Sequence, residues 1–313
     1  MKIVPIVFAF DNNLILPACV CISSLMMNAK EDTFYDIFIL HSERVSLEKD
    51  QLDKIPLYYT NCRIQYRQVD NTFDSAYEVR GITTATYYRL LIPELIPEYD
   101  KIIYSDVDVI FREDLSDIYL STELDDVYLA GVNSLFFLIP GYKKYYSSIL
   151  NLDASKIIYA GNIVLNSRLL VSKGIVSKFK DLIKNDYTYQ DMDIINIACK
   201  GKIKQLPPSF CVTNYLNEIM VYHPDKLEGL WTRKEIHDAL SHGIVHYNGQ
   251  KPWKGYCVNF DIWWEYYRKS PFFDEKFYFD FFYSKLDELD KLTLWKRIKV
   301  LVRWFIVGRK KMD

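Results

Sequence analysis

The chain has 313 residues, of which 50% are hydrophobic and 26% charged, with 39 basic and 41 acidic side chains. This composition excludes a disordered chain, a collagen-like chain and a disulfide-stabilised miniprotein, and the length is enough to bury a core. No apolar run reaches the roughly 18 residues that span a bilayer, and no cleavable leader is expected. The six cysteines form no C-x-x-C pair and no zinc-like cluster, so we expect buried thiols in a reducing cytosol.

Short runs rich in β-branched residues alternate along the chain with segments of helical periodicity. The predicted strands are residues 3–8, 35–41, 63–69, 101–105, 127–132 and 157–165, and the predicted helices are 16–30, 84–95 and 169–184. This alternation predicts an α/β sheet with mostly parallel strands, in which a ligand lies beyond the carboxyl ends of the strands. Neither G-x-G-x-x-G nor a Walker-type loop occurs, so a bound diphosphate needs another neutralising group.

A pair of aspartates follows the strand predicted over 101–105. Residues two apart in an extended chain point the same way, so Asp106 and Asp108 face one ligand while Val107 packs behind them. Two convergent carboxylates suit a hard divalent cation, whereas aspartates at strand ends also form Asx turns. A rival reading is the D-x-D pair of haloacid-dehalogenase phosphatases. That pattern continues with Thr and Gly early in its domain, but here two apolar residues follow, more than a hundred residues into the chain.

A histidine far downstream completes a candidate ligand set. A short strand over 244–247 carries His246, Gly249 permits a tight turn, and Lys251 precedes a stiff proline and a bulky tryptophan. A single histidine at a strand end is more often structural than a ligand. Together with the two aspartates, however, it makes an O,O,N set open to diphosphate oxygens. This mixture favours Mn²⁺ over Ca²⁺ or Mg²⁺, with Mg²⁺ kept as the alternative ion, and Lys251 would stand where a departing phosphate gathers charge.

Residues 291–313 carry eight basic side chains against one acidic. Their apolar residues fall on one arc of a helix and most basic ones on the other, which indicates a basic amphipathic helix. Such a helix either docks on the core or lies on a membrane surface. Trp295, Trp304 and the terminal basic cluster favour an anionic membrane. Nucleic acid is a poor alternative, since the rest of the chain is net negative.

Five segments resemble glycosyltransferase family eight, the retaining enzymes that include bacterial lipooligosaccharide galactosyltransferases and glycogenin. In the family's order they are FAFDNN (8–13), TYYRLLIPELIPEYDKIIYSDVDVIF (86–111), AGNIVLNSRLL (160–170), YQDMDIIN (189–196) and HYNGQKPW (246–253). The resemblance runs from about Lys2 to Tyr267. It implies a GT-A nucleotide-diphospho-sugar fold, which is a Rossmann-like α/β fold, together with a UDP-sugar donor and Mn²⁺.

The resemblance also implies roles for single residues. By position, Asp106, Asp108 and His246 look like the metal ligands, and Asp191 and Lys251 like catalytic residues. The remaining substrate contacts fall into three groups. Those at the uridine are Ala9, Asp11 and Asn13, and those at the diphosphate are Gly249 and Lys251. Those at or near the donor sugar are Asn133, Ala160, Gly161, Asn162 and Asp191. Arg89 would reach the donor sugar or the diphosphate, and Val107 is a further substrate contact.

Three positions depart from the family's pattern. Tyr159 stands where the family has the asparagine of an N-A-G motif, with Asn162 as a conjectured replacement for the amide. Asn133 stands where an acidic residue is expected. Met192 replaces a glutamine near the anomeric carbon, and a thioether cannot serve as that amide. Asp191 has the carboxylate that could bind hydroxyls of the donor sugar. The alternative role for Asp191 is a negative charge at a helix N-terminus that stabilises the helix dipole.

These inferences predict a GT-A catalytic domain over 1–256, aromatic-rich helices packed on it over 257–290 and a membrane-surface tail over 291–313. We expect a cytosolic, membrane-peripheral enzyme that moves galactose or glucose from a UDP-hexose to a glycan or glycolipid acceptor such as lipopolysaccharide. The cation and Lys251 would relieve the charge on departing UDP, and Met192 favours front-face attack by the acceptor over a side-chain nucleophile. The alternative is a UDP-sugar-binding or scaffold protein that has lost turnover.

Overall fold

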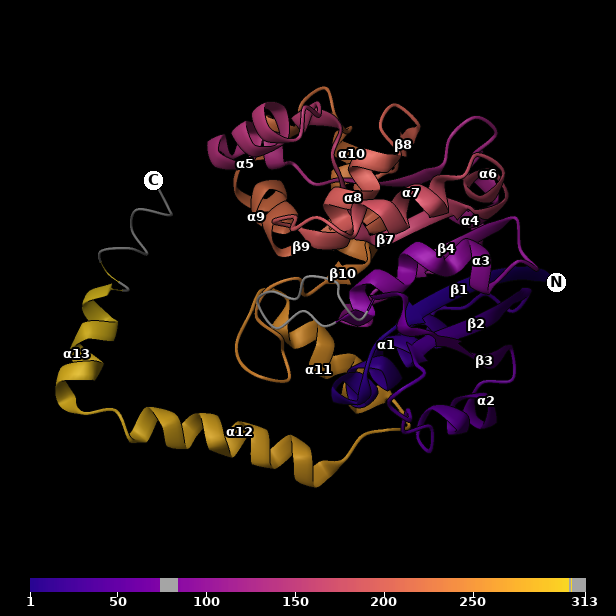
Figure 1. Ribbon diagram of the computed structural model, residues 1–313. Helices are drawn as coiled ribbons and strands as arrows, with labels where there is room; N and C mark the ends of the chain where they lie inside the picture. Colours follow the sequence, from indigo (N-terminus) through magenta and orange to yellow (C-terminus); the bar gives the residue numbers. More distant parts are fainter. Residues whose placement is uncertain (74–83, 304, 306–313) are drawn as a thin grey trace.

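The computed structural model describes residues 1–73, 84–303 and 305, and its main body is built on a seven-stranded sheet (Figure 1). The strand order is β3-β2-β1-β4-β7-β6-β8. The strands are β1 Lys2–Ala9, β2 Thr33–Ser42, β3 Cys62–Val69, β4 Lys101–Ser105, β6 Leu129–Asn133, β7 Ile158–Asn166 and β8 Ile203–Gln205. Strand β7 runs antiparallel to both of its neighbours, and the other pairs are parallel. The predicted mostly parallel α/β sheet is confirmed.

A second, three-stranded sheet adjoins the end of β4. It consists of β5 Val109–Ile110, β10 Val245–His246 and β9 Val212–Thr213, in the order β5-β10-β9. Strand β10 pairs antiparallel with β5, which sets His246 opposite Val109, and parallel with β9. Because β5 follows Asp108 directly, this pairing brings the histidine beside the aspartate pair.

Helices cover both faces of the large sheet (Figure 1). Alternate side chains of β1 point to opposite faces, so that Ile6 and Phe8 lie in one core and Val7 in the other. The helices are α1 Ile15–Met27, α2 Ile55–Tyr58, α3 Ile92–Leu95, α4 Ser116–Ser121, α5 Pro140–Lys144, α6 Ser167–Ser172, α7 Ile175–Leu182, α8 Gln190–Ala198, α9 Asn214–Tyr222, α10 Arg233–His242, α11 Phe260–Lys269, α12 Glu275–Asp290 and α13 Leu294–Arg303. Helices α1, α4, α9 and α10 contribute to the first core, and α3, α6, α7 and α8 to the second.

Two predicted helices differ from the observed ones. The helix predicted over 169–184 is divided into α6 and α7 at Gly174, whose φ of +67° interrupts the helical path. The segment predicted as a helix over 84–95 begins as a 3₁₀ helix, Thr84–Leu91, and becomes α3 only afterwards. Within it the Thr86 carbonyl accepts a hydrogen bond from Nε of Arg89, at 2.9 Å, so this side chain engages the backbone of its own turn.

The C-terminal helices differ in how they meet the body. Helix α11 buries Trp263, Trp264 and Tyr267 in a core shared with Val20 of α1 and with β5 and β10. Helix α12 follows it, with Phe281 in the same core, and α13 then lies apart from the sheet (Figure 1). None of the described residues of α13 is buried.

The tail was expected to lie on a membrane rather than cross it. Across residues 1–73, 84–303 and 305, the structure holds no helix with the length and apolar character that crossing a bilayer requires. Trp304 and the basic cluster at 309–311 lie outside the described residues.

Candidate active site

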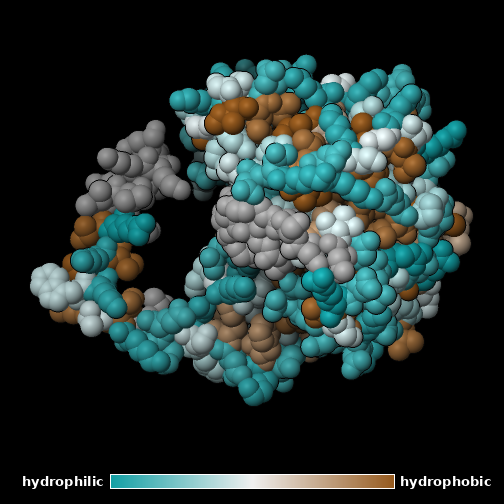
Figure 2. Space-filling view, viewed as in Figure 1, coloured by the Kyte–Doolittle hydropathy of each residue, from teal (hydrophilic) through white to brown (hydrophobic). Residues whose placement is uncertain are grey.

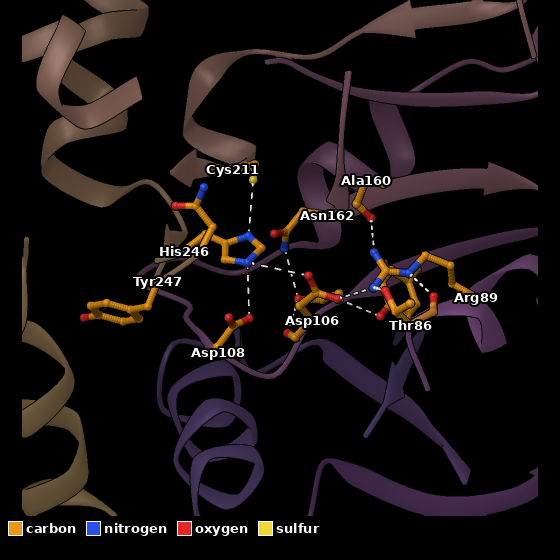
Figure 3. A network of polar contacts seen from close by, with 12 residues as sticks. Thr86, Arg89, Asp106, Asp108, Ala160, Asn162, Cys211, His246 and Tyr247 are labelled. Atoms are coloured by element: carbon orange, nitrogen blue, oxygen red, sulfur yellow. Dashed lines mark hydrogen bonds and ion pairs between the residues drawn. The ribbon is translucent and has the colours of Figure 1, made fainter. Parts of the chain in front are cut away.

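Asp106, Asp108 and His246 meet just beyond the carboxyl end of β4 (Figure 3). Nε2 of His246 lies 3.2 Å from Oδ1 of Asp108 and 3.5 Å from Oδ2 of Asp106. One ligand atom from each residue lies within 4.8 Å of the other two, and only 1% of His246 is exposed. Two carboxylate oxygens and one imidazole nitrogen at this spacing fit a single divalent cation.

The backbone explains why the aspartates stand where they do. The N–H of Asp106 donates to the Gly161 carbonyl at 2.8 Å, which continues the pairing of β4 with β7 by one residue. Val107 then buries its side chain in the core, as the alternation predicts, so only its backbone is left to meet a substrate. Asp108 follows, and β5 begins immediately after it.

The buried guanidinium of Arg89 bridges two carboxylates. Nη2 lies 2.7 Å from Oδ1 of Asp106, and Nε lies 3.2 Å from Oδ2 of Asp191. Nη1 donates to the Ala160 carbonyl at 2.8 Å. The other oxygen of Asp191 accepts from the Thr86 hydroxyl at 2.9 Å. Arg89 therefore joins Asp106 of the candidate metal site to Asp191 at the start of α8, and its contact with the donor remains a prediction.

Burial and charge shift the protonation of the site in different directions. Burial raises the pKa of Asp191 to about 6, although Arg89 favours the carboxylate. For His246 burial disfavours the charged form, but the neighbouring Asp108 outweighs it and raises the pKa to about 10. Burial also acts against ionised Asp108, yet Lys251 and His246 hold its pKa below its usual range. Lys251 and His246 therefore keep the carboxylate of Asp108 ionised.

Lys251 stands on the other side of Asp108. Its ammonium forms an ion pair with Oδ2 of Asp108 and donates to the Tyr247 carbonyl at 2.6 Å. Nearby, the backbone of Gly249 runs against the side chain of Asn214, since a Cβ on the glycine would stand 3.1 Å from Nδ2. The structure thus brings Lys251, but not Gly249, into direct contact with a proposed metal ligand.

The residues that depart from the family's pattern, together with Asn162, lie in different environments. The Tyr159 ring stands edge-on to His246, with ring centroids 5.1 Å apart. Asn162 is fully buried and donates to the Ser105 hydroxyl at 3.0 Å, so it presents no surface to a sugar. Asn133 donates to the Ser155 carbonyl at 2.7 Å and accepts from the Leu135 N–H at 2.9 Å, which ties its amide to the following loop. The side chain of Met192 lies in the core.

A cavity of about 310 Å³ opens at the carboxyl ends of β1 and β2. Two of the three residues predicted at the uridine, Asp11 and Asn13, line it, whereas Ala9 does not. Sequence reasoning missed the other walls of this cavity, which are Phe10, Asn12, His41, Ser42, Val45, Leu47, Thr84, Ala85 and Tyr88. The end of the strand predicted over 35–41 was the available signal for His41, because neighbouring parallel strands end at the same edge.

The model of the family described as glycosyl transferase family 8 matches residues 5–257. The chain belongs to glycosyltransferase family 8. A putative glycosyltransferase of Haemophilus influenzae is 27% identical over 155 residues, which cover 49% of this chain and 44% of that protein. General stress protein A of Bacillus subtilis is 23% identical over 266 residues, which cover 82% of this chain and 85% of that protein. Glycosyltransferase GlyF of Streptococcus pneumoniae is 24% identical over 266 residues, which cover 83% of this chain and 60% of that protein.

Solved structures resemble the chain over most of its length. An active-site mutant of LgtC has a TM-score of 0.72 at 21% identity, covering 87% of this chain and 98% of that one. GlyE of Streptococcus pneumoniae has a TM-score of 0.60 at 21% identity, and the match covers 85% of this chain and 60% of that one. These likenesses confirm the predicted GT-A fold. The chain spans less than two thirds of the H. influenzae protein, GlyF and GlyE.

Proposed function

We propose that this family 8 protein is a retaining glycosyltransferase that moves galactose or glucose from a UDP-sugar to a glycan or glycolipid acceptor. Its cation would be Mn²⁺, with Mg²⁺ as the alternative, held by Asp106, Asp108 and His246. The observation that carries the proposal is the convergence of these three side chains, from distant parts of the chain, with Lys251 beside them. A galactosyltransferase, LgtC, has been solved with donor and acceptor sugar analogues, which supports the same substrate classes here.

The site residues have distinct tasks in this proposal. A bound cation supplies a positive charge that stabilises the diphosphate of the leaving UDP. Lys251 adds a second positive charge on the same side, where preorganised donors contribute about 3–4 kcal/mol in comparable sites. Arg89 contacts both Asp106 and Asp191 and so holds them in place, and Asp191 would bind hydroxyls of the donor sugar.

The surroundings of Asp191 and Met192 support front-face attack by the acceptor. Met192 packs in the core and carries no nucleophilic group. Both oxygens of Asp191 are already engaged, one by Thr86 and the other by Arg89. The acceptor would then attack from the side that the phosphate leaves, and the phosphate would take its proton. A glycosyl adduct trapped on any side chain would contradict this mechanism.

Hydrolysis of UDP-sugars in the presence of Mn²⁺ tests the proposal. A panel of UDP-hexoses should show release of UDP that requires Mn²⁺ and falls at least a hundredfold in Asp108→Asn. Lys173→Gln, an exposed substitution away from the site, serves as the control. Binding of UDP with Mn²⁺ but no turnover on any donor or acceptor would favour the scaffold alternative. Phosphate release from simple phosphomonoesters would instead favour a phosphatase.

We also propose that α13 binds the protein to an anionic membrane on the cytoplasmic side. The large apolar residues of α13 are exposed, including 76% of Trp295 and 73% of Leu294. Figure 2 shows hydrophobic and hydrophilic residues side by side along this arm. An unpartnered apolar face next to Lys296, Lys299 and Arg303 fits anionic headgroups. Removing residues 291–313 should abolish sedimentation with anionic vesicles and preserve UDP-sugar hydrolysis, whereas unchanged sedimentation would contradict the proposal.

A further inference from the structure

The two ring nitrogens of His246 face different partners. Nε2 faces the carboxylates of Asp106 and Asp108, whereas Nδ1 lies 3.6 Å from the sulfur of Cys211 (Figure 3). Cys211 is 1% exposed. It directly precedes β9, whose parallel pairing with β10 sets Val212 beside Val245. The second sheet therefore fixes the thiol and the imidazole next to each other.

The other close neighbours of this ring offer Nδ1 no hydrogen bond. Tyr159 meets the ring edge-on, and the Gly161 carbonyl accepts from the N–H of Asp106 at 2.8 Å. Among the described residues, the sulfur of Cys211 is the one hydrogen-bond partner found at Nδ1. A histidine that binds a metal through Nε2 carries its proton on Nδ1, and a partner at Nδ1 fixes both this tautomer and the ring orientation.

We propose that Cys211 is a positioning residue for the metal centre. Its sulfur accepts the Nδ1–H of His246 and so directs the lone pair of Nε2 toward the cation. The inference rests on the proposed metal site and extends it to a residue that does not itself touch the ion. Carboxylates and backbone carbonyls usually fill this role, and loss of such a partner typically weakens metal binding by 10-fold to 100-fold. Because a thiol sulfur is a weaker acceptor, we expect the lower end of this range.

An isosteric pair of variants separates hydrogen bonding from packing. Cys211→Thr supplies a hydroxyl that can accept from Nδ1–H, and Cys211→Val has the same shape without it. The extended backbone at Cys211, with φ of −161° and ψ of 90°, accommodates β-branched side chains. Cys199→Val, at a fully buried cysteine in the core of the opposite face, is the matched control.

The readout is the binding of Mn²⁺ alone, which is monitored through the electron paramagnetic resonance signal of the free ion. Cys211→Val should weaken Mn²⁺ binding about tenfold, and Cys211→Thr should bind within about threefold of the wild type. Cys199→Val should bind Mn²⁺ like the wild type. Equal binding by the Val and Thr variants would overturn the inference. A wild type that binds no Mn²⁺ would instead overturn the metal site itself. If either variant fails to fold by circular dichroism, Cys211→Ser and Cys211→Ala repeat the comparison with the same expected order.

Discussion

Gly161 lies directly against the imidazole of His246, so close that a Cβ on this glycine would stand 2.2 Å from Cε1 of the ring. The same Cβ would stand 2.7 Å from Oδ2 of Asp106. The glycine is needed here for space and not for a positive φ. The bare backbone of β7 is what lets the carboxylate and the imidazole converge.

Gly161→Ala should therefore damage the metal site. The methyl group must push His246 or Asp106 away, and we expect Mn²⁺ affinity to fall at least tenfold, as it does when a residue that orients a metal ligand is lost. Gly141→Ala is the matched control, because a Cβ there meets no atom within 4 Å. Calorimetric titration with Mn²⁺ measures both variants. Wild-type affinity in Gly161→Ala would show that the ligands do not depend on this close approach.

Lys251→Met should have opposite effects on the cation and on the nucleotide. The ammonium is paired with Asp108, so it competes with a cation for the negative charge of the same carboxylate. Without it, Mn²⁺ alone should bind several-fold more tightly, while UDP in the presence of Mn²⁺ should bind several-fold more weakly. Lys254→Met, at an exposed lysine of the same loop, is the control. Weaker binding of Mn²⁺ alone would refute the competition.

Asp191 should make stability fall as the pH rises. Its pKa is raised by burial from 3.8 to about 6, so between these values the folded state keeps a proton that the unfolded state has lost. Ionising Asp191 therefore costs stability above about pH 4, by on the order of 2 to 3 kcal/mol at pH 7. Asp191→Asn has no carboxyl group to ionise at this position, so its free energy of unfolding should rise relative to that of the wild type from pH 4 to pH 7. Denaturant unfolding in chelator measures this difference, and a pH-independent difference would be inconsistent with the raised pKa.

The basic face of α13 should govern membrane binding through charge. Replacing Lys296, Lys299 and Arg303 with glutamine removes three positive charges, each contributing about 1 kcal/mol near an anionic surface. Partitioning onto vesicles that contain anionic lipid should fall about a hundredfold, with no change in UDP-sugar hydrolysis. Zwitterionic vesicles are the control for apolar insertion. Undiminished partitioning of the triple variant would argue against electrostatic binding.

Regular parts of the fold were predictable from local patterns, and contacts between distant segments were not. Strands such as 101–105 are short, buried and rich in β-branched residues, so their periodicity identifies them. The division of 169–184 at Gly174 was missed because an isolated glycine inside a helical pattern is often tolerated.

The convergence of Asp106, Asp108 and His246 could be predicted because each stands in a recognisable motif, and the structure brings the three side chains together as a candidate metal site. The bridge from Arg89 to Asp191 depends on how the 3₁₀ segment Thr84–Leu91 packs against α8. The contact of Cys211 with His246 depends on the pairing of β9 with β10. No local spacing encodes either contact.

The most direct test of the proposed centre is a crystal of the full chain grown with Mn²⁺ and UDP, with the ion located by its anomalous scattering. We expect one peak at bonding distance from the carboxylates of Asp106 and Asp108, from Nε2 of His246 and from the diphosphate of UDP. A peak elsewhere, or UDP bound with no ion among these three side chains, would contradict the proposal.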